Sequence, residues 1–176
     1  MQDKPLIARP PIGVRASRRG IIAAAAGAVA ATTPTQAQNT PPGVRIFNPP
    51  GMPKPVGFSQ IAEVTAGRTV YIAGQIGIDP SGKQVGGPGD FRAQATQAFE
   101  NLKVALAAAG GGFENLVKLS VYFTDLAAHA QTFRDVRDSY VNKDAPPPST
   151  FVQVARLARD WVLLEVEATA VVPART

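Results

Sequence analysis

Apolar residues recur three and four positions apart over one long stretch of the chain, which is the spacing of a helix that buries one face. After Phe91 the stretch carries Ala95, Ala98, Phe99, Leu102, Ala105, Leu106 and Ala109 at these steps. Asp90 stands where an N-cap residue belongs, and Gly110 opens a run of three glycines that stops the pattern. The sequence therefore predicts a helix over 91–109.

A second, shorter apolar stripe follows Thr124 and Asp125, where we expect the next helix to start. Its members are Leu126, Ala130, Phe133, Val136 and Tyr140. Three consecutive prolines, the first of them Pro146, end the loop that comes after this stripe. The pattern predicts a second helix with one buried face.

Around the predicted helices, short runs rich in β-branched and aromatic residues indicate strands. They span residues 58–64, 69–72, 116–123, 150–156 and 161–172. The valine- and leucine-rich character of the last two fits a central position in a sheet. The order of two strands, a helix, a strand, a helix and two strands contains no repeat. It predicts an α+β fold, a single-layer mixed sheet with two helices on one face.

A sheet covered by helices on one face leaves its other face without a partner inside the chain. The last two predicted strands carry Val152, Val154, Leu164 and Val166, and these residues or their alternate neighbours face away from the helices. Such a surface is too apolar to meet water, and no further predicted element remains to cover it. The pattern therefore predicts that the protein associates with copies of itself.

The first 37 residues carry the pattern of an export signal. Arg18 and Arg19 follow a serine and precede a short alanine-rich apolar run over 21–31. Small residues then stand at the third and the last position before a cleavage site after Ala37. A basic region, a short apolar region and a small-residue cleavage site in this order are typical of a secretory signal.

The paired arginines resemble the twin-arginine class of signals, which exports folded proteins. The apolar run is about half the length that spans a bilayer, so we expect no permanent membrane anchor. We expect cleavage near Ala37 and a periplasmic or secreted mature protein. The alternative is a cytosolic protein with an N-terminal extension or a misassigned start codon. Residues 38–55 then form a proline-rich extended lead-in, and residues 56–173 form the domain.

Composition and charge narrow the function further. The chain has 176 residues, 45% of them hydrophobic, which suits one globular domain with an appendage. Five of the 18 Lys and Arg residues lie in the leader with one of the 13 Asp and Glu residues, which leaves 13 bases against 12 acids. The net charge of +5 therefore belongs mostly to the leader. The domain lacks the electrostatics of a nucleic-acid binder, and we expect no nucleic-acid partner.

The chain contains no cysteine and a single histidine, His129. The absence of cysteine excludes a disulfide scaffold, a thiol nucleophile and every cysteine-containing zinc motif. A Ser-His-Asp site is excluded unless His129 itself serves in it, and we interpret His129 as a surface or packing residue. We expect no metal site and no cofactor.

Several segments of the mature chain carry motifs as well as a hydrophobic pattern. They are VYIAGQIGID at 70–79, NLK at 101–103, VKLSVYFTDL at 117–126, VQVARL at 152–157 and LEVEA at 164–168. In this order they resemble the Rid family (RidA/YjgF), the reactive-intermediate deaminases, from about residue 46 to residue 172. The resemblance implies a homotrimer whose sheets pack into a central barrel with the helices outside. It also implies a small-molecule cleft at each subunit interface.

The resemblance further implies hydrolysis of 2-imino or enamine acids by a few groups in that cleft. An arginine that opens the penultimate strand grips the substrate carboxylate with its forked donors. A glutamate on the last strand positions the water or shuttles a proton. Glu165 stands at the glutamate position and is the implied catalytic residue, and Gly74 stands at the glycine of the family's Ser-Gly-Gln motif.

Four other positions of the implied cleft depart from the family pattern. Ser149 stands at the arginine position, Phe151 where cysteine is common, Ala73 at the serine and Phe58 at the tyrosine. Losing the charge partner of a buried carboxylate costs about 2–5 kcal/mol, which argues against turnover of 2-imino acids and favours a neutral or less polar ligand. Arg156 does not replace the arginine, because strand alternation places it on the other face from Ser149, where we expect an ion pair.

The sequence leaves two functions open. One is an exported Rid-family homotrimer that binds a small molecule between its subunits and hydrolyses an imine or enamine through Glu165. The other is a non-catalytic trimer that binds a small molecule or acts as a holdase. The identity of the ligand separates the two.

Overall fold

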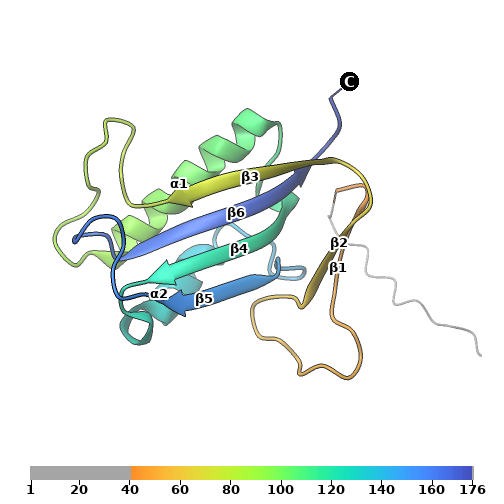
Figure 1. Ribbon diagram of the computed structural model, residues 1–176, viewed down its shortest axis with the longest axis horizontal. Helices are drawn as coiled ribbons and strands as arrows, with labels where there is room; N and C mark the ends of the chain where they lie inside the picture. The colour runs from red at the N-terminus through yellow and green to blue at the C-terminus, as the bar shows by residue number, and fades with distance from the viewer. Residues whose placement is uncertain (1–40, 176) are drawn as a thin grey trace, which may run out of the picture. The chain divides into compact units, whose positions relative to one another are not determined.

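The computed structural model describes residues 41–175 (Figure 1). The predicted leader, 1–37, lies outside the described residues, as does the start of the lead-in. The elements in chain order are β1 (Val44–Phe47), β2 (Ile61–Val64), β3 (Arg68–Gln75), α1 (Phe91–Ala109), a short 3-10 turn (Phe113–Asn115), β4 (Leu116–Phe123), α2 (Leu126–Arg137), β5 (Ser149–Gln153) and β6 (Leu164–Val172). No helix within the described range is both long and apolar enough to span a membrane.

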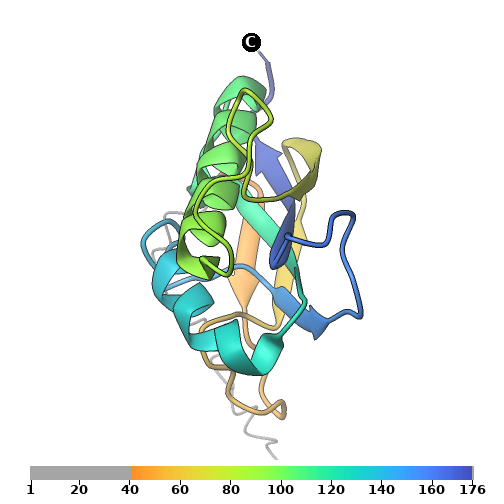
Figure 2. The same ribbon diagram turned by 90° about the vertical axis from the view of Figure 1, so that its left-hand side faces the viewer.

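Four strands form the main sheet in the order β3-β6-β4-β5. β6 pairs antiparallel with β3 and β4, whereas β5 runs parallel to β4, so the sheet is mixed. Both helices cover the same face of this sheet (Figure 2). The predicted α+β class, with two helices on one face of a mixed sheet, is confirmed. β6 is central as predicted, but β5 is an edge strand, because among the described strands it pairs with β4 alone.

The helices begin and end where their capping residues predict. The Asp90 side chain accepts a hydrogen bond from the Ala93 amide at the start of α1, and Gly110 ends that helix with a left-handed φ of 87°. The Asp125 side chain accepts from the Ala128 amide at the start of α2. These contacts satisfy backbone groups that a helix terminus leaves free, which is why the local sequence specifies the boundaries.

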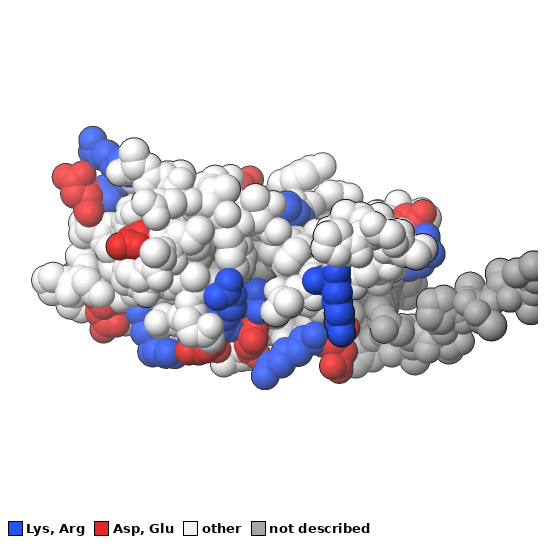
Figure 3. Space-filling model, turned by 90° about the horizontal axis from the view of Figure 1, so that it is seen from below, with Lys and Arg blue, Asp and Glu red and all other residues white. Residues whose placement is uncertain are grey.

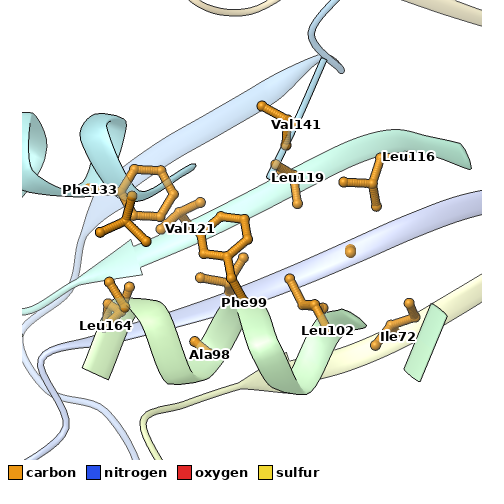
Figure 4. Packing of buried hydrophobic residues seen from close by; sticks show 14 of the residues in the cluster. Ile72, Ala98, Phe99, Leu102, Leu116, Leu119, Val121, Phe133, Val141 and Leu164 are labelled. Carbon is orange, nitrogen blue, oxygen red and sulfur yellow. The ribbon is translucent and has the colours of Figure 1, made fainter. Parts of the chain in front are cut away.

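The helices bury their apolar faces against β4 and β6. Phe99 and Leu102 of α1 and Phe133 of α2 are fully buried among the inward side chains of the sheet (Figure 4). Tyr140, which the stripe placed in the second helix, lies just after α2, and its hydroxyl donates a 2.8 Å hydrogen bond to Glu100. Burial, together with the Glu100 carboxylate, raises the pKa of Tyr140 to about 12. This contact joins the end of α2 to α1.

A strand lies within the predicted lead-in, which differs from the simple extended segment we expected there. β1 pairs antiparallel with β2 in a separate two-stranded sheet. Val44 and Ile46 of β1 are buried in a second, smaller apolar cluster with Val117 and Val171 of the main sheet. Val171 alternates with the helix-facing Ala170, so this hairpin covers one end of the sheet face away from the helices. The prediction that no element of the chain covers that face is therefore wrong at this end.

The rest of that face, called the open face below, is polar. Leu164 and Val166 are fully buried on the helix side, so the alternate residues Glu165 and Glu167 point the other way. Lys118, Ser120, Tyr122, Thr150 and Thr169 share the open face with them by register. Of the apolar residues named from the sequence, Val152 alone is exposed here, at 38%. The expectation of a broadly apolar open face is wrong, because Leu164 and Val166 of β6 turn toward the helices.

Candidate functional site

Three of the predicted ligand-binding residues lie together. Phe58, Ser149 and Phe151 line one cavity of about 180 Å³, called the β5 pocket below, whose other lining residues are Val56, Arg134 and Arg137. Phe58 comes from the loop between β1 and β2, which approaches the start of β5 (Figure 1). The Ser149 hydroxyl donates to the Pro147 carbonyl at 3.0 Å. Three of the residues singled out from the sequence thus form part of the lining of one cavity.

Two arginines of α2 form a wall of the β5 pocket that sequence reasoning missed. Arg134 and Arg137 lie three positions apart and therefore share one face of the helix. Arg137 is only 5% exposed, and its Nε and Nη2 donate to Asp138 Oδ1 at 2.9 Å and 2.6 Å. The sequence contains one feature that could have pointed to these arginines, namely two bases three positions apart beside the apolar stripe of the helix.

The predicted catalytic residue lies elsewhere, on the open face. Glu165 of β6 packs its carboxylate against Gly74, near the end of β3, at a break in the β3–β6 register. A Cβ at Gly74 would collide with Glu165 Oε1 and would lie 2.6 Å from its Cδ. A glycine is therefore what lets the carboxylate lie on the β3 backbone. The neighbouring Ala73 is exposed, so these three predicted residues form a second group.

A tyrosine on β4 completes the polar surroundings of Glu165. Tyr122 is the register partner of Glu165, and its hydroxyl donates to Glu167 Oε2 at 3.2 Å. The hydrogen bond and negative charge of Glu167 raise the pKa of Tyr122, and Glu165 adds a smaller effect in the same direction. This part of the open face thus holds two carboxylates and a phenol that stays protonated at neutral pH.

The two groups of predicted residues lie on opposite faces of the sheet. Phe151 pairs with Val121, which is buried toward the helices, and its ring packs 5.0 Å from that of Phe133. Glu165 pairs with Tyr122, the next residue of β4, whose side chain alternates to the open face. A cleft formed within one chain would require Ser149 and Phe151 to lie in front of Glu165. Because they lie on the opposite face, one chain alone does not form a cleft that contains all three.

Two other residues singled out from the sequence belong to neither group. Arg156 lies beyond the end of β5, and its Nε is 3.2 Å from Asp160 Oδ1, which confirms the predicted ion pair. It lines a separate hollow from the β5 pocket. His129 stacks on Phe91 with ring centroids 4.2 Å apart, which is the packing role that we expected.

Comparison with known proteins assigns the family. A family model described as Endoribonuclease L-PSP matches residues 52–172. A crystal structure of a Rid-family protein from Yersinia pestis superposes with a TM-score of 0.65 at 33% identity, covering 74% of this chain and 99% of that one. The chain belongs to the Rid family. Members of the family are generally small homo-oligomers.

Other Rid relatives cover the same part of the chain. A RutC family protein of Synechocystis is 35% identical over 130 residues, which are 74% of this chain and 98% of that protein. The mouse 2-iminobutanoate/2-iminopropanoate deaminase is 39% identical over 114 residues, 65% of this chain and 80% of that enzyme. RidA from a Psychrobacter species superposes with a TM-score of 0.55 at 36% identity, covering 68% of this chain and 93% of that structure. Several Rid relatives are thus similar over nearly their whole length.

Proposed function

We propose that the mature chain is an exported Rid-family protein that forms a homotrimer, binds a small molecule between subunits and hydrolyses an imine or enamine with Glu165. The observation that carries this proposal is the fit of the Glu165 carboxylate against Gly74, a position where every other residue would displace it. Deaminase activity of a relative that is 39% identical supports the reaction class.

The placement of the two residue groups supports a site shared between subunits. The β5 pocket lies on the helix side at an edge strand, and Glu165 lies on the open face of the central strand β6. A second copy can bring its own open face to the edge that a first copy presents. Each cleft of a closed trimer then takes the β5 pocket from one subunit and Glu165 from its neighbour.

The chemistry assigned to Glu165 needs only water and the substrate. The carboxylate accepts a proton from the water as its oxygen adds to the carbon of the C=N bond. The proton then passes to the nitrogen, which gives a carbinolamine. Glu165 next moves the proton of the new hydroxyl to the same nitrogen, so that the C–N bond breaks and ammonia leaves as the carbonyl forms. No hydrogen bond from another described residue reaches the Glu165 carboxylate, which leaves its oxygens free to hold the water.

The alternative is a non-catalytic trimer that binds a small molecule or acts as a holdase. It is favoured by the four cleft positions that are apolar or neutral where the family has polar or charged groups, namely Phe58, Ala73, Ser149 and Phe151. In that case Glu165 is an interface carboxylate without a reaction to catalyse.

The test compares two carboxylates of the same strand. Hydrolysis of imines, with 2-iminobutanoate generated from its amino acid in the assay, is measured for the wild type, Glu165→Gln and Glu167→Gln. Glu167 is the matched control, because it shares the strand and the open face but does not contact Gly74. We expect loss of at least 100-fold of kcat/KM in Glu165→Gln alone, which is the range of a lost general base. Equal activity of the two variants would contradict the role of Glu165, and no hydrolysis by the wild type would favour the non-catalytic alternative.

A further inference from the structure

We infer that Arg134 and Arg137 of α2 form the anion anchor that β5 lacks at Ser149, so that the ligand of the β5 pocket carries a carboxylate beside a small apolar group. The inference rests on the proposed function, because it names the substrate class of the same site. It replaces the neutral ligand expected from the sequence.

Arg137 is a fixed part of the pocket wall. Its Nε and Nη2 both bind Asp138 Oδ1, and Gly57 of the β1–β2 loop lies against the guanidinium. A Cβ at Gly57 would come within 2.8 Å of Nη2, and the φ of +72° at this residue also favours glycine. Nη1 makes no hydrogen bond to any described residue. A donor held in place before the ligand arrives loses little conformational entropy on binding.

The positive charge of the pocket comes from Arg134. Asp138 balances the charge of Arg137, whereas no carboxylate among residues 41–175 lies within ion-pair distance of Arg134. Asp135, the next residue, pairs instead with Arg92 at 3.4 Å and accepts from Gln131. Figure 3, which views this side from below, shows Lys and Arg side chains interspersed with Asp and Glu, not one broad basic patch. The unbalanced positive charge is therefore confined to the surroundings of Arg134, which suits the binding of one small anion.

The rest of the lining selects a small, partly apolar molecule. Val56, Phe58 and Phe151 supply apolar walls, and the Ser149 hydroxyl already donates to Pro147. A volume of about 180 Å³ equals about six waters at roughly 30 Å³ each, enough for an acid of a few carbons. A neighbouring hollow shares Arg134 and Arg137 and adds Lys143 and Asp138. Three bases against one acid line that hollow, so the surroundings also favour an anion.

The probe is 2-oxobutanoate, the stable acid that hydrolysis of 2-iminobutanoate releases, and its neutral amide serves as the matched ligand. Both are titrated by NMR into the wild type, Arg134→Ala, Arg134→Lys and Arg156→Ala. Arg156 is the matched control, because it is exposed, ion-paired and outside the β5 pocket. We expect the Kd of the acid to rise at least tenfold in Arg134→Ala and less in Arg134→Lys, with no change in Arg156→Ala and no effect on the amide.

The outcome separates this inference from the proposed function. Glu165→Gln should bind the acid as the wild type does while losing turnover. A wild type that binds the acid but hydrolyses no imine would defeat the proposed reaction and leave the anion anchor standing. Equal affinity for acid and amide, no binding of the acid at millimolar concentration, or a larger loss in Arg156→Ala than in Arg134→Ala overturns the anion anchor. Thermal melting of each variant verifies the fold, and Arg134 is exposed, so its replacement leaves the core intact.

Discussion

Phe151 and Glu165 lie on opposite faces of one sheet, on strands that flank β4, because their β4 partners Val121 and Tyr122 are consecutive residues. From the sequence we expected both residues to line one cleft. Their separation within one chain means that a cleft that contains both takes them from different subunits. This relationship leads to a direct test of where the site is assembled.

Mixed oligomers of two inactive variants should regain activity. Glu165→Gln removes the open-face half of the site, and Arg134→Glu reverses the charge of the pocket half. In trimers refolded from an equal mixture, about a quarter of the sites combine two unaltered halves, since each half comes from an independently drawn subunit. We expect about a quarter of wild-type activity from variants that each retain less than about a tenth. Activity no higher than the mean of the separate variants would place the whole site in one chain.

The mature chain should be a trimer. The measurement is light scattering on protein that begins near Gln38, with three subunits as the expected mass. Tyr71 on the open face is 83% exposed in the single chain, and packing between sheets would bury such a side chain. A stable monomer at micromolar concentration would contradict both the barrel and the shared site.

Gly74→Ala should reduce activity with little loss of stability. The added methyl meets the Glu165 carboxylate, the movable end of a side chain, so the carboxylate is displaced from its place against β3. A shift of about 1 Å in a catalytic group costs about 100-fold in rate, and we expect kcat/KM for the imine to fall at least tenfold. Gly87→Ala is the control, because a Cβ there has no neighbour within 4 Å. Unchanged activity of Gly74→Ala would remove the structural argument for Glu165.

Tyr140 should make the protein less stable at high pH. Its pKa is about 12 in the folded chain against 10.0 for the free side chain, with burial as the main cause. The stabilising contribution is complete below pH 10 and is lost as the pH rises toward 12, because the unfolded chain ionises first. The free energy of unfolding from urea titrations at pH 9 and pH 11 should fall more in the wild type than in Tyr140→Phe. An equal fall in both proteins would contradict the assignment.

The arginine pair of the leader should direct export. Replacing Arg18 and Arg19 with lysine together should retain the protein inside the cell, because the twin-arginine class depends on the paired guanidinium groups. Cell fractionation and N-terminal sequencing measure this, with the wild-type mature chain expected to begin near Gln38. Full-length protein in the cytoplasm, unaffected by the replacement, would support a cytosolic protein with an N-terminal extension instead.

The sequence by itself determined the local features of the molecule. Asp90 and Gly110 bound α1, and Asp125 starts α2, because capping residues act within one helical turn. β4 spans 116–123 as predicted, since its run of apolar residues alternates from Leu119 to Phe123. The order of motifs likewise identified the Rid-like stretch.

Tertiary structure alone decided which faces and which elements meet. Alternation along a strand tells which residues share a face, but packing across the sheet decides which face the helices cover, and here it turned Leu164 inward and Glu165 outward. The pairing of β1 with β2 closes a long loop, which no short-range pattern encodes. The presence of Arg134 and Arg137 in the β5 pocket likewise depends on tertiary packing. Because α2 packs beside β5, its two arginines line the same pocket as Ser149.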